Sequence, residues 1–390
     1  MSKQIYCGKG KSWGVEWKRY TDRDTGAAVR QLTDYYAHHY HVYFTNNGWY
    51  DGGRKLLMGG DRENKYNLYS IDLTSGEIIQ LTDYTRITVP DDANFQCICV
   101  NPTKDEAYFW DMNRLTAIDL TSLDERVIWE APKGYMRTIL NVTSDGQYVI
   151  GSLVKDLSDT IETDLQHGYV GFEEIWAAKP HSMIYKTPIC GGDTKIVFED
   201  NCWIGHVNTS PAQPGVITFC HEGPWEKVDH RIWALNHDDG KVWKIRERKS
   251  ESETIGHEYW YADGVTIGYH GADSASGHRF FGRIRYDNSC ESETLFPYET
   301  GHIHSNDEKF IVGDGNPNYV LIWRYCRDNN TYEGPRALCI HASSRHQQFV
   351  HVHPRFSKDG SQVVFTSDRT GYGSPYIVDV PEFDTLPEIK

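Results

Sequence analysis

Several features that would mark an exported, membrane-bound or disulfide-linked protein are missing from this sequence. No apolar run reaches the ~18 residues that a bilayer-spanning helix needs, and the first residues lack the apolar core of a signal peptide. The nine cysteines are odd in number and include no Cys-x-x-Cys pair, which argues against a disulfide framework and against a thiolate zinc site. We therefore expect a protein of the reducing cytoplasm with no membrane partner.

Clustered positive charge is missing as well. Lysine and arginine total 40 against 55 aspartate and glutamate residues, a formal net charge of −15, and no stretch gathers the basic residues that phosphate binding requires. We therefore expect no nucleic-acid partner, although a small anionic ligand fits, because a pocket can be locally cationic on an acidic surface. The chain also has no P-loop, no Gly-x-Ser-x-Gly and no Rossmann fingerprint, which excludes nucleotide-dependent and standard serine-hydrolase chemistry.

What the sequence does contain is a repeat of short strands rich in aromatic residues. The pattern Ile-Asp-Leu-Thr-Ser occurs at residues 71–75 and again at residues 118–122, each time followed by another apolar strand. Asp-Gly turns between apolar strands recur at residues 51–52, 145–146, 263–264 and 359–360. Four short strands in ~40–50 residues are typical of one β-propeller blade.

The repeat predicts an all-β fold, a seven-bladed β-propeller that residues 1–390 form as a single domain. Residues 27–34 (AAVRQLTD) resemble the outer strand of the first blade (EIIQLTD), so we expect the N-terminal strand to close the ring in the last blade. An acidic stretch at about residues 155–180 interrupts the third blade and is expected to lie over one face as an insertion. The alternative is a sandwich or two small β-domains. The innermost strands are expected to start near Val42, Phe95, Ile139, His206, His257, His302 and His353.

Four consecutive predicted blades place a histidine at the start of the innermost strand, at intervals of about 45 to 51 residues. These are His206, His257, His302 and His353. Such starts converge around one mouth of the ring. A single histidine is usually structural, but core packing does not explain four in register, so the sequence predicts a functional cluster there. The repeat does not fix the register of His38, His39 and His41.

The last of these histidines belongs to a metal-binding pattern, Gln-Phe-Val-His-Val-His at residues 348–353. On an extended strand residues i and i+2 share a face, so His351 and His353 can point at one ion. His302 from the neighbouring blade would supply a third nitrogen, and Gln348 an amide oxygen. Three nitrogens and one oxygen, completed by water, suit an octahedral ion such as Mn²⁺ better than Ca²⁺ or a closed zinc site. The alternative is a solvated histidine pair.

Other polar residues fall at the same predicted mouth. Arg231 precedes an apolar strand of the fourth blade and is suited to hold a substrate carboxylate with its planar fork, the alternative being a surface salt bridge. Asp314 ends a strand of the sixth blade and is either part of the site or a turn residue. We also expect His206 and His221 to contact the substrate.

At these residues the sequence resembles the oligogalacturonate lyase family of cytoplasmic pectin-degrading enzymes. The resemblance is carried by residues 218–233 (TFCHEGPWEKVDHRIW), 256–260 (GHEYW), 301–315 (GHIHSNDEKFIVGDG) and 348–368 (QFVHVHPRFSKDGSQVVFTSD). Weaker similarity runs across nearly the whole chain. The extra histidine His304 and the stretch at residues 155–180 depart from the family's pattern, which bears on the preferred chain length and the uronide.

The resemblance implies a seven-bladed propeller, a Mn²⁺-type ion and β-elimination on short α-1,4-linked galacturonides. By motif match the metal ligands would be His302, Gln348, His351 and His353. His257 would be the base that abstracts the proton, with His206 and His221 as weaker candidates for that role. Arg231 would contact the substrate carboxylate or the transition state.

The chemistry explains why both a metal and a base are expected. β-Elimination on a uronide removes the C5 proton beside the carboxylate and expels the sugar linked at O4. A general base contributes only ~10²–10⁴-fold, which is too little for so weak a carbon acid. A divalent ion on the carboxylate lowers the barrier further by neutralising the developing charge. Two other functions remain open, a metal-dependent propeller lyase for another uronide and a non-catalytic TolB-like propeller that binds or scaffolds other proteins.

Overall fold

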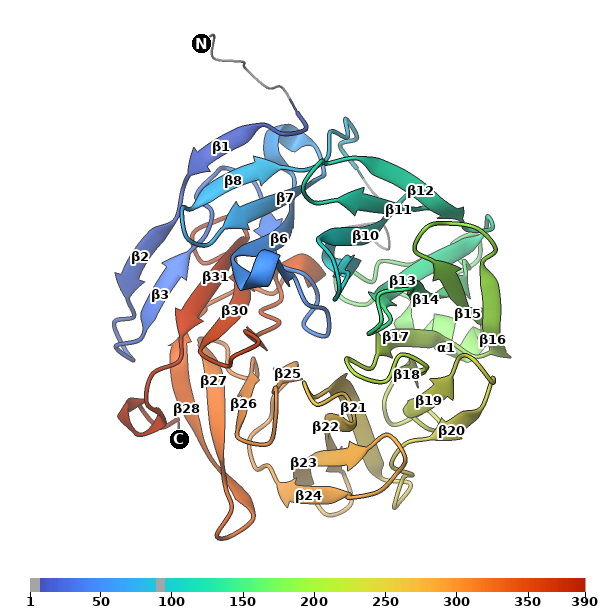
Figure 1. The fold of residues 1–390 in the computed structure, drawn as a ribbon. Coiled ribbons are helices and arrows are strands. Elements are labelled where there is room, and N and C mark those ends of the chain that lie inside the picture. The colour runs from blue at the N-terminus through green and yellow to red at the C-terminus, as the bar shows by residue number, and fades with distance from the viewer. Residues whose placement is uncertain (1–7, 89–94, 390) are drawn as a thin grey trace.

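The computed structural model describes residues 8–88 and 95–389. The described residues form seven antiparallel sheets arranged in a ring about a common axis (Figure 1). This confirms the predicted all-β fold and the seven-bladed β-propeller. Within those described residues, no helix is long and apolar enough to cross a membrane.

Blades two to six each contain four strands that follow the chain from the axis outward. The second blade has β9 (Cys99–Val100), β10 (Glu106–Asp111), β11 (Arg114–Asp119) and β12 (Glu125–Glu130). The third has β13 (Tyr135–Val142), β14 (Tyr148–Lys155), β15 (His181–Pro188) and β16 (Lys195–Asn201). The fourth has β17 (Ile204–Thr209), β18 (Val216–His221), β19 (Ile232–Asn236) and β20 (Val242–Lys244). The fifth has β21 (Glu253–Trp260), β22 (Thr266–Asp273), β23 (His278–Arg285) and β24 (Ser292–Leu295). The sixth has β25 (Ile303–His304), β26 (Phe310–Gly313), β27 (Tyr319–Cys326) and β28 (Thr331–Ile340).

The first and last blades contain strands from both ends of the chain. The first has β4 (His39–Tyr40), β5 (Trp49–Tyr50), β6 (Lys55–Gly60), β7 (Asn67–Asp72), β8 (Glu77–Gln80) and, on its outer edge, β1 (Ser12–Val15). Its innermost strand is thus split in two, and Val42, the expected strand start, lies between the two halves. The last blade has β29 (Arg355–Phe356), β30 (Gln362–Ser367), β31 (Ser374–Asp379), β3 (Ala28–Gln31) and β2 (Lys18–Thr21).

The N-terminal strand closes the ring as the sequence predicts. Val29 of β3 pairs with Val378 of β31 in an antiparallel ladder, and β2 continues the sheet outward. The same N-terminal segment also supplies β1 to the first blade, where it pairs with β8. Residues 12–31 therefore connect the last blade to the first.

Apolar side chains fill the spaces between neighbouring blades. In β10 every residue is buried, including the run Tyr108-Phe109-Trp110, because the strand lies between two other sheets. Tyr108 packs with Leu153 of β14 and Tyr185 of β15 across the junction between blades two and three. Burial on both faces explains why the central strands are continuous aromatic and aliphatic runs rather than alternating patterns.

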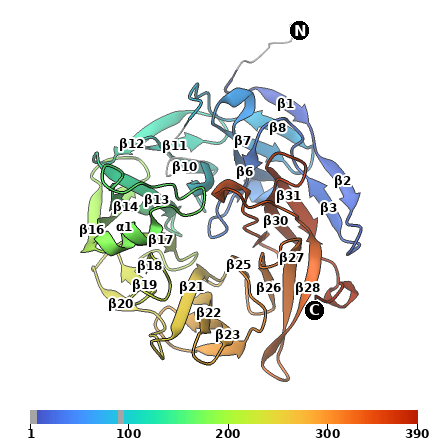
Figure 2. The ribbon, with the colours of Figure 1, turned by 180° about the vertical axis from the view of Figure 1, so that it is seen from behind.

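The stretch at residues 155–180 connects β14 to β15 and contains the α-helix α1 (Phe172–Ala178). Figure 2 shows α1 on the side of the ring that faces the viewer, beside β17. Ile175 packs against Val154 and Trp203, which anchors the helix over the third and fourth blades. The other helical turns in the described part of the chain are η1 (Asp51–Gly53), η2 (Arg62–Asn64), η4 (Phe95–Cys97), η5 (Gln348–Val350) and η6 (Phe383–Thr385).

Candidate active site

One end of the ring contains a cavity of about 530 Å³ whose wall is rich in polar side chains. The inner strands of several blades and the connection from β14 to β15 contribute to it. The wall contains the polar side chains of His206, Glu222, Arg231, His257, His302 and Gln348. Three of the four histidines predicted in register therefore face the same cavity.

Backbone bulges aim two of these histidines at the cavity. His206 lies inside β17 and His257 inside β21, rather than at the strand starts that the repeat predicts. Each strand has a register shift at its histidine, and φ is 45° at His206 and 50° at His257. A bulge redirects a side chain that strand alternation would place elsewhere. Left-handed backbone at a non-glycine residue costs ~1–3 kcal/mol and is concentrated at functional sites.

His302 is oriented by a buried carboxylate. Its Nδ1 lies 2.8 Å from Asp314 Oδ2, and its backbone N–H donates to Asp314 Oδ1 at 2.8 Å. Burial alone would raise the pKa of Asp314, but the His302 hydrogen bond and the neighbouring Arg345 and histidines outweigh it and hold that pKa at about 2. An ionised Asp314 accepts a hydrogen bond from His302 Nδ1–H, which leaves Nε2 with the lone pair that a metal needs.

His302, His351 and His353 form a cluster with the geometry of a cation site. One donor atom from each lies within 4.8 Å of the others. The Nε2 atoms of His302 and His353 are only 3.2 Å apart, and the two ring centroids are separated by 4.1 Å. A borderline divalent cation fits such a set of imidazole nitrogens, because one ring is already held by a carboxylate on its far side.

The backbone that brings Gln348 and His351 to this cluster has a conformation that the sequence did not predict. The expected extended strand is absent from residues 348–353, where Gln348 begins the 3₁₀ turn η5 and His351 follows it with φ −63°. His353 then adopts a left-handed φ of 44°. The i, i+2 argument for a shared strand face was therefore wrong, although the two rings still come within 5.6 Å of each other. Gln348 lines the cavity and donates to Tyr169 Oη at 2.6 Å.

His257 lies beside the cluster without belonging to it. Its ring centroid is 4.7 Å from that of His302, and its Nδ1 lies 3.0 Å from His270 Nε2. The other side of His270 donates to the backbone carbonyl of Gly301. His270 Nε2 must then accept, so His257 Nδ1 carries the proton and His257 Nε2 keeps a free lone pair. Burial, with the charges of His302 and other neighbours, lowers the pKa of His257 well below its ordinary value.

Arg231 is buried and held by two carboxylates rather than exposed in a surface salt bridge. Its Nη1 lies 2.8 Å from Glu222 Oε1, and its Nε is 3.6 Å from Glu258 Oε2. Burial alone would raise the pKa of Glu222, but Arg231 outweighs this and lowers it to about 2. Burial raises the pKa of Glu258. The guanidinium therefore stands in the cavity wall in a fixed orientation with its charge balanced by Glu222.

His206 and His221 have different positions. His206 faces the cavity, 3.5 Å from Glu222 Oε2, and burial lowers its pKa to about 4. His221 is absent from the cavity lining among the described residues, which corrects its expected role in substrate binding. Side chains alternate along β18, so Cys220 points toward Glu222 while His221 stacks on Trp233 on the opposite face.

Of the N-terminal histidines, whose register the repeat left open, His41 supports the site and His39 does not. His41 is buried, with Nε2 2.8 Å from the carbonyl oxygen of His353 and Nδ1 2.7 Å from Thr366 Oγ1. It therefore fixes the backbone that carries a proposed ligand. His39 contacts Arg62, at 2.7 Å from its Nε, outside the cavity.

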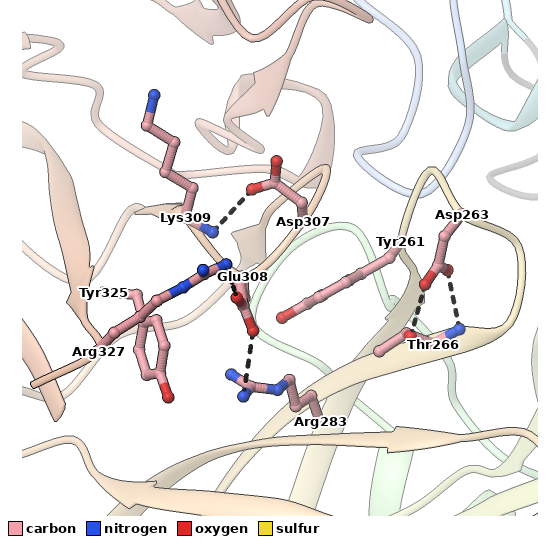
Figure 3. Close-up of a pocket in the computed structure, with 9 residues that line it drawn as sticks. All are labelled: Tyr261, Asp263, Thr266, Arg283, Asp307, Glu308, Lys309, Tyr325 and Arg327. Carbon is pink, nitrogen blue, oxygen red and sulfur yellow. Dashed lines mark hydrogen bonds and ion pairs between the residues drawn. The ribbon is translucent and has the colours of Figure 1, made fainter. Parts of the chain in front are cut away.

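A second cavity, of about 590 Å³, lies between the fifth and sixth blades (Figure 3). Glu308 in its wall is paired with Arg283 at 3.1 Å and with Arg327 at 2.7 Å. Figure 3 shows that its labelled lining has no histidine or cysteine. Its carboxylates form no cluster with histidine or cysteine among the described residues, and Glu308 is already neutralised by two arginines, so the histidine cavity is the candidate active site.

Comparison with known proteins agrees with this geometry. The sequence model of the family described as oligogalacturonate lyase matches residues 7–334. The chain is 28% identical to an oligogalacturonide lyase of Pectobacterium atrosepticum over 399 aligned positions, covering 96% of this chain and 98% of that protein. It is 26% identical to an oligogalacturonate lyase of Dickeya dadantii, again covering 96% and 98%.

Solved structures give the same result. An oligogalacturonate lyase in complex with manganese superposes with a TM-score of 0.84 and 27% identity, covering 96% of this chain and 99% of that one. The oligogalacturonate lyase of Vibrio parahaemolyticus superposes with a TM-score of 0.83 and 25% identity, with the same coverage. The family match spans most of the chain, and this protein belongs to the oligogalacturonate lyase family.

Proposed function

We propose that this protein is a metal-dependent lyase that cleaves short α-1,4-linked galacturonides by β-elimination and leaves an unsaturated uronide product. The observation that carries the proposal is a cluster of three imidazoles with a fourth, unligated imidazole beside it. His302, His351 and His353 converge on a single point, while His257 faces the same cavity with its own nitrogen free. A cation site beside an unligated base is what this reaction requires.

The charges of the cavity explain why a cation is needed. Among the described residues of the wall, the Arg231 guanidinium is already balanced by Glu222, and Asp314 is ionised behind His302. Burial keeps the imidazoles of His206 and His257 uncharged near neutral pH, because it lowers both pKa values. A galacturonide brings a carboxylate on each ring into this negative and neutral surrounding. A divalent cation held by His302, Gln348, His351 and His353 would supply the positive charge that the substrate carboxylate and the developing negative charge require.

We propose Mn²⁺ as that cation. Three imidazole nitrogens and an amide oxygen are borderline ligands, and the set contains no thiolate that would favour zinc. A related lyase of solved structure holds manganese. The residues of this chain that bear the ligands come from neighbouring blades and a turn, so the ring itself determines their spacing.

The proton transfer is assigned to His257. Its Nε2 carries the lone pair, because Nδ1 is engaged with His270. A nitrogen bound to a metal has no lone pair left for a proton, so the base must be a histidine outside the cluster. Arg231, held by Glu222 and Glu258, would orient the substrate carboxylate at the wall of the cavity.

The state of the cysteines supports a proposal for the cellular location. All eight cysteines in the described part of the chain are free, and three of them, Cys99, Cys220 and Cys339, are buried in the blades. Unpaired buried thiols are typical of proteins that work in a reducing compartment. We propose that the enzyme acts in the cytoplasm.

The test is a spectrophotometric assay with oligogalacturonides. The unsaturated product absorbs in the ultraviolet, so its formation can be followed directly, before and after treatment with EDTA and again after Mn²⁺ is added back. We expect activity that EDTA abolishes and Mn²⁺ restores. Oligomers of mannuronate or guluronate, assayed in parallel, distinguish a lyase for another uronide. A protein that produces no unsaturated product from any of these substrates with Mn²⁺ present would contradict the proposal.

A further inference from the structure

A second group of metal-ligating side chains lies at the junction of the third and fourth blades, outside the histidine cavity. One donor atom each from Asp200, Cys202 and His221 lies within 4.8 Å of the others. Asp200 belongs to β16, Cys202 to the connection from β16 to β17, and His221 is the last residue of β18. The proposed function uses none of these three side chains.

The backbone holds the three residues in this arrangement. The Ser182 hydroxyl donates to the carbonyl oxygen of Cys202 at 2.6 Å and accepts from the N–H of Ile204 at 3.2 Å, so the connection between the blades is fixed. His221 is buried and its ring stacks on Trp233 with 4.8 Å between centroids. The backbone at Cys202 and the ring of His221 are therefore positioned before any ligand arrives.

The charge around this group also favours a cation. His221 Nδ1 lies 2.8 Å from Asp229 Oδ1, the kind of carboxylate partner that commonly orients metal-binding imidazoles. Within residues 8–88 and 95–389, no lysine or arginine forms an ion pair with Asp200 or Asp229. Two carboxylates thus stand beside a thiol and an imidazole, and their ion pairs in the described part of the chain involve no lysine or arginine.

We propose that Asp200, Cys202 and His221 bind a Zn²⁺ ion, with Asp229 as the carboxylate that orients or completes the site. A thiolate, an imidazole and a carboxylate form a mixed set that zinc accepts in tetrahedral geometry, with water in a remaining position. The Cys202 thiol loses its proton to solvent as the sulfur binds the ion, so no oxidant or reductant is involved. This set differs from the imidazole-and-amide set of the cavity, and the two sites select different metals.

The ion would link two blades. Asp200 and Cys202 lie at the end of the third blade, whereas His221 ends the second strand of the fourth blade. Binding to the folded state alone raises the apparent stability of the protein. We therefore expect Zn²⁺ to increase the melting temperature, and we expect galacturonide cleavage to be independent of this site.

The test uses a protein in which the cavity cluster is removed by His351→Ala and His353→Ala; Cys202→Ser then distinguishes the second site from the remaining group of His206, Cys220 and Glu258. After treatment with chelator, this protein is titrated with Zn²⁺ in competition with a chromophoric chelator. We expect one Zn²⁺ per chain, and a loss of affinity of 100-fold or more when Cys202→Ser is added. Cys190→Ser, at an exposed cysteine elsewhere, is the matched control and should bind as before.

Two further measurements make the result independent of folding defects in the variants. In the otherwise unaltered chain, Co²⁺ bound at this site should show thiolate-to-metal charge-transfer absorption, and Zn²⁺ should protect Cys202 from alkylation by iodoacetamide. Asp200→Asn, a substitution at an exposed position, should weaken both the charge-transfer absorption and the protection of Cys202. If the double-alanine protein takes up no Zn²⁺, or if Cys202→Ser leaves uptake unchanged and Zn²⁺ does not protect Cys202, the proposal is wrong.

Discussion

At the scale of single residues, the candidate site depends on hydrogen bonds that determine which ring nitrogen of each histidine is free. Asp314 accepts a hydrogen bond from Nδ1–H of His302, and His270 accepts one from Nδ1–H of His257. In both histidines the lone pair on Nε2 therefore remains available for binding within the site. The two rings are neighbours of the same chemical type, and their proposed roles differ only because one converges on the cluster and the other does not.

The first prediction concerns the base. We expect His257→Ala to lower turnover by ~10²–10⁴-fold, because no other group in the wall has a free nitrogen at the same place. Mn²⁺ content and substrate affinity should change little, since His257 is outside the ligand set. Turnover by the assay above, metal content by mass spectrometry and affinity by calorimetry are the three measurements.

Arg231→Ala and His206→Ala are the comparisons for this variant. Arg231→Ala should damage both binding and rate, because a carboxylate contact acts in the ground state and in the transition state. His206 faces the same cavity and is the alternative base. Near-normal turnover in His257→Ala together with an inactive His206→Ala would show that the base is His206 and not His257.

The second prediction treats His270 as a positioning residue. His270→Ala removes the acceptor for His257 Nδ1–H, so kcat should fall by ~10–100-fold, the usual effect of losing an outer-shell partner, while KM changes little. His270→Gln offers an amide oxygen as acceptor and should recover part of kcat.

The pH dependence of kcat/KM distinguishes a positioning role of His270 from a purely structural one, because a structural role would not shift it. The His270 charge is one of the causes, after burial and His302, that lower the pKa of His257. A variant without that charge should let the pKa of His257 rise. The acid limb of kcat/KM, where protonation of the base removes activity, should then move to higher pH. An unchanged acid limb in an inactive His270→Ala would indicate a folding defect instead.

The sequence identifies some of these residues and not others for a physical reason. The blade repeat carries His206, His257, His302 and His353 at a fixed register, so the spacing alone predicts that they share one end of the ring. His270 lies on the second strand of its blade, and it reaches His257 only because the bulge in β21 turns that ring. No spacing in the sequence records a bulge, so this pair could not be predicted.

At the scale of secondary-structure elements, the connection that contains α1 covers the cavity. Tyr169, just before the helix, meets Gln348, and Trp176 of the helix packs against the Cys-His-Glu-Gly-Pro loop after β18. The closest approach is at Gly223, which has a φ of 139°. A side chain at Gly223 would place its Cβ only 2.3 Å from Trp176 Cδ1.

The third prediction tests this contact. Gly223→Ala should displace α1 and raise KM several-fold, because the element over the cavity loses its position. Stability should fall by about 1–3 kcal/mol from backbone strain and overpacking. Thermal denaturation and steady-state kinetics are the measurements.

Gly240→Ala is the matched control, because Gly240 has a similarly left-handed φ of 75° but open space around the added Cβ. Gly240→Ala should lower the free energy of unfolding without changing KM. If the helix contact is responsible, Trp176→Ala added to Gly223→Ala should bring KM back toward that of Trp176→Ala alone. A KM that stays raised in the double variant would place the effect in the loop itself.

Strands are easier to predict than the turns that carry the chemistry. The paired Ile-Asp-Leu-Thr-Ser segments and the Asp-Gly turns correspond to β7, β11 and the hairpins of four blades. Residues 348–353, by contrast, combine a 3₁₀ turn with a left-handed histidine. Alternation along a strand was the wrong basis for that segment, because local backbone conformation decides where each of its rings points.

At the scale of the whole molecule, the ring is closed by strands from opposite ends of the chain. β3 pairs with β31, and Val29 packs with Val363 and Val378 in the core of the last blade. The ligands are distributed over this ring, since His302 precedes β25 and His353 precedes β29. The closure therefore determines the distance between the sixth and seventh blades on which the cluster depends.

The fourth prediction tests closure with two valines from the N-terminal segment. Val29 is 2% exposed and Val15, on the outer strand β1, is 58% exposed. Val29→Asp places an unpaired carboxylate in the closing core, which should destabilise the protein by about 3–5 kcal/mol and lower Mn²⁺ affinity, because the last blade is no longer held against the first. Val15→Asp adds the same charge at the surface and should change stability by no more than about 0.5 kcal/mol. Denaturant unfolding and metal titration measure both effects. Equal stability of the two variants would mean that the ring holds together without its N-terminal strand, and the closure by β3 would then be incidental to the site.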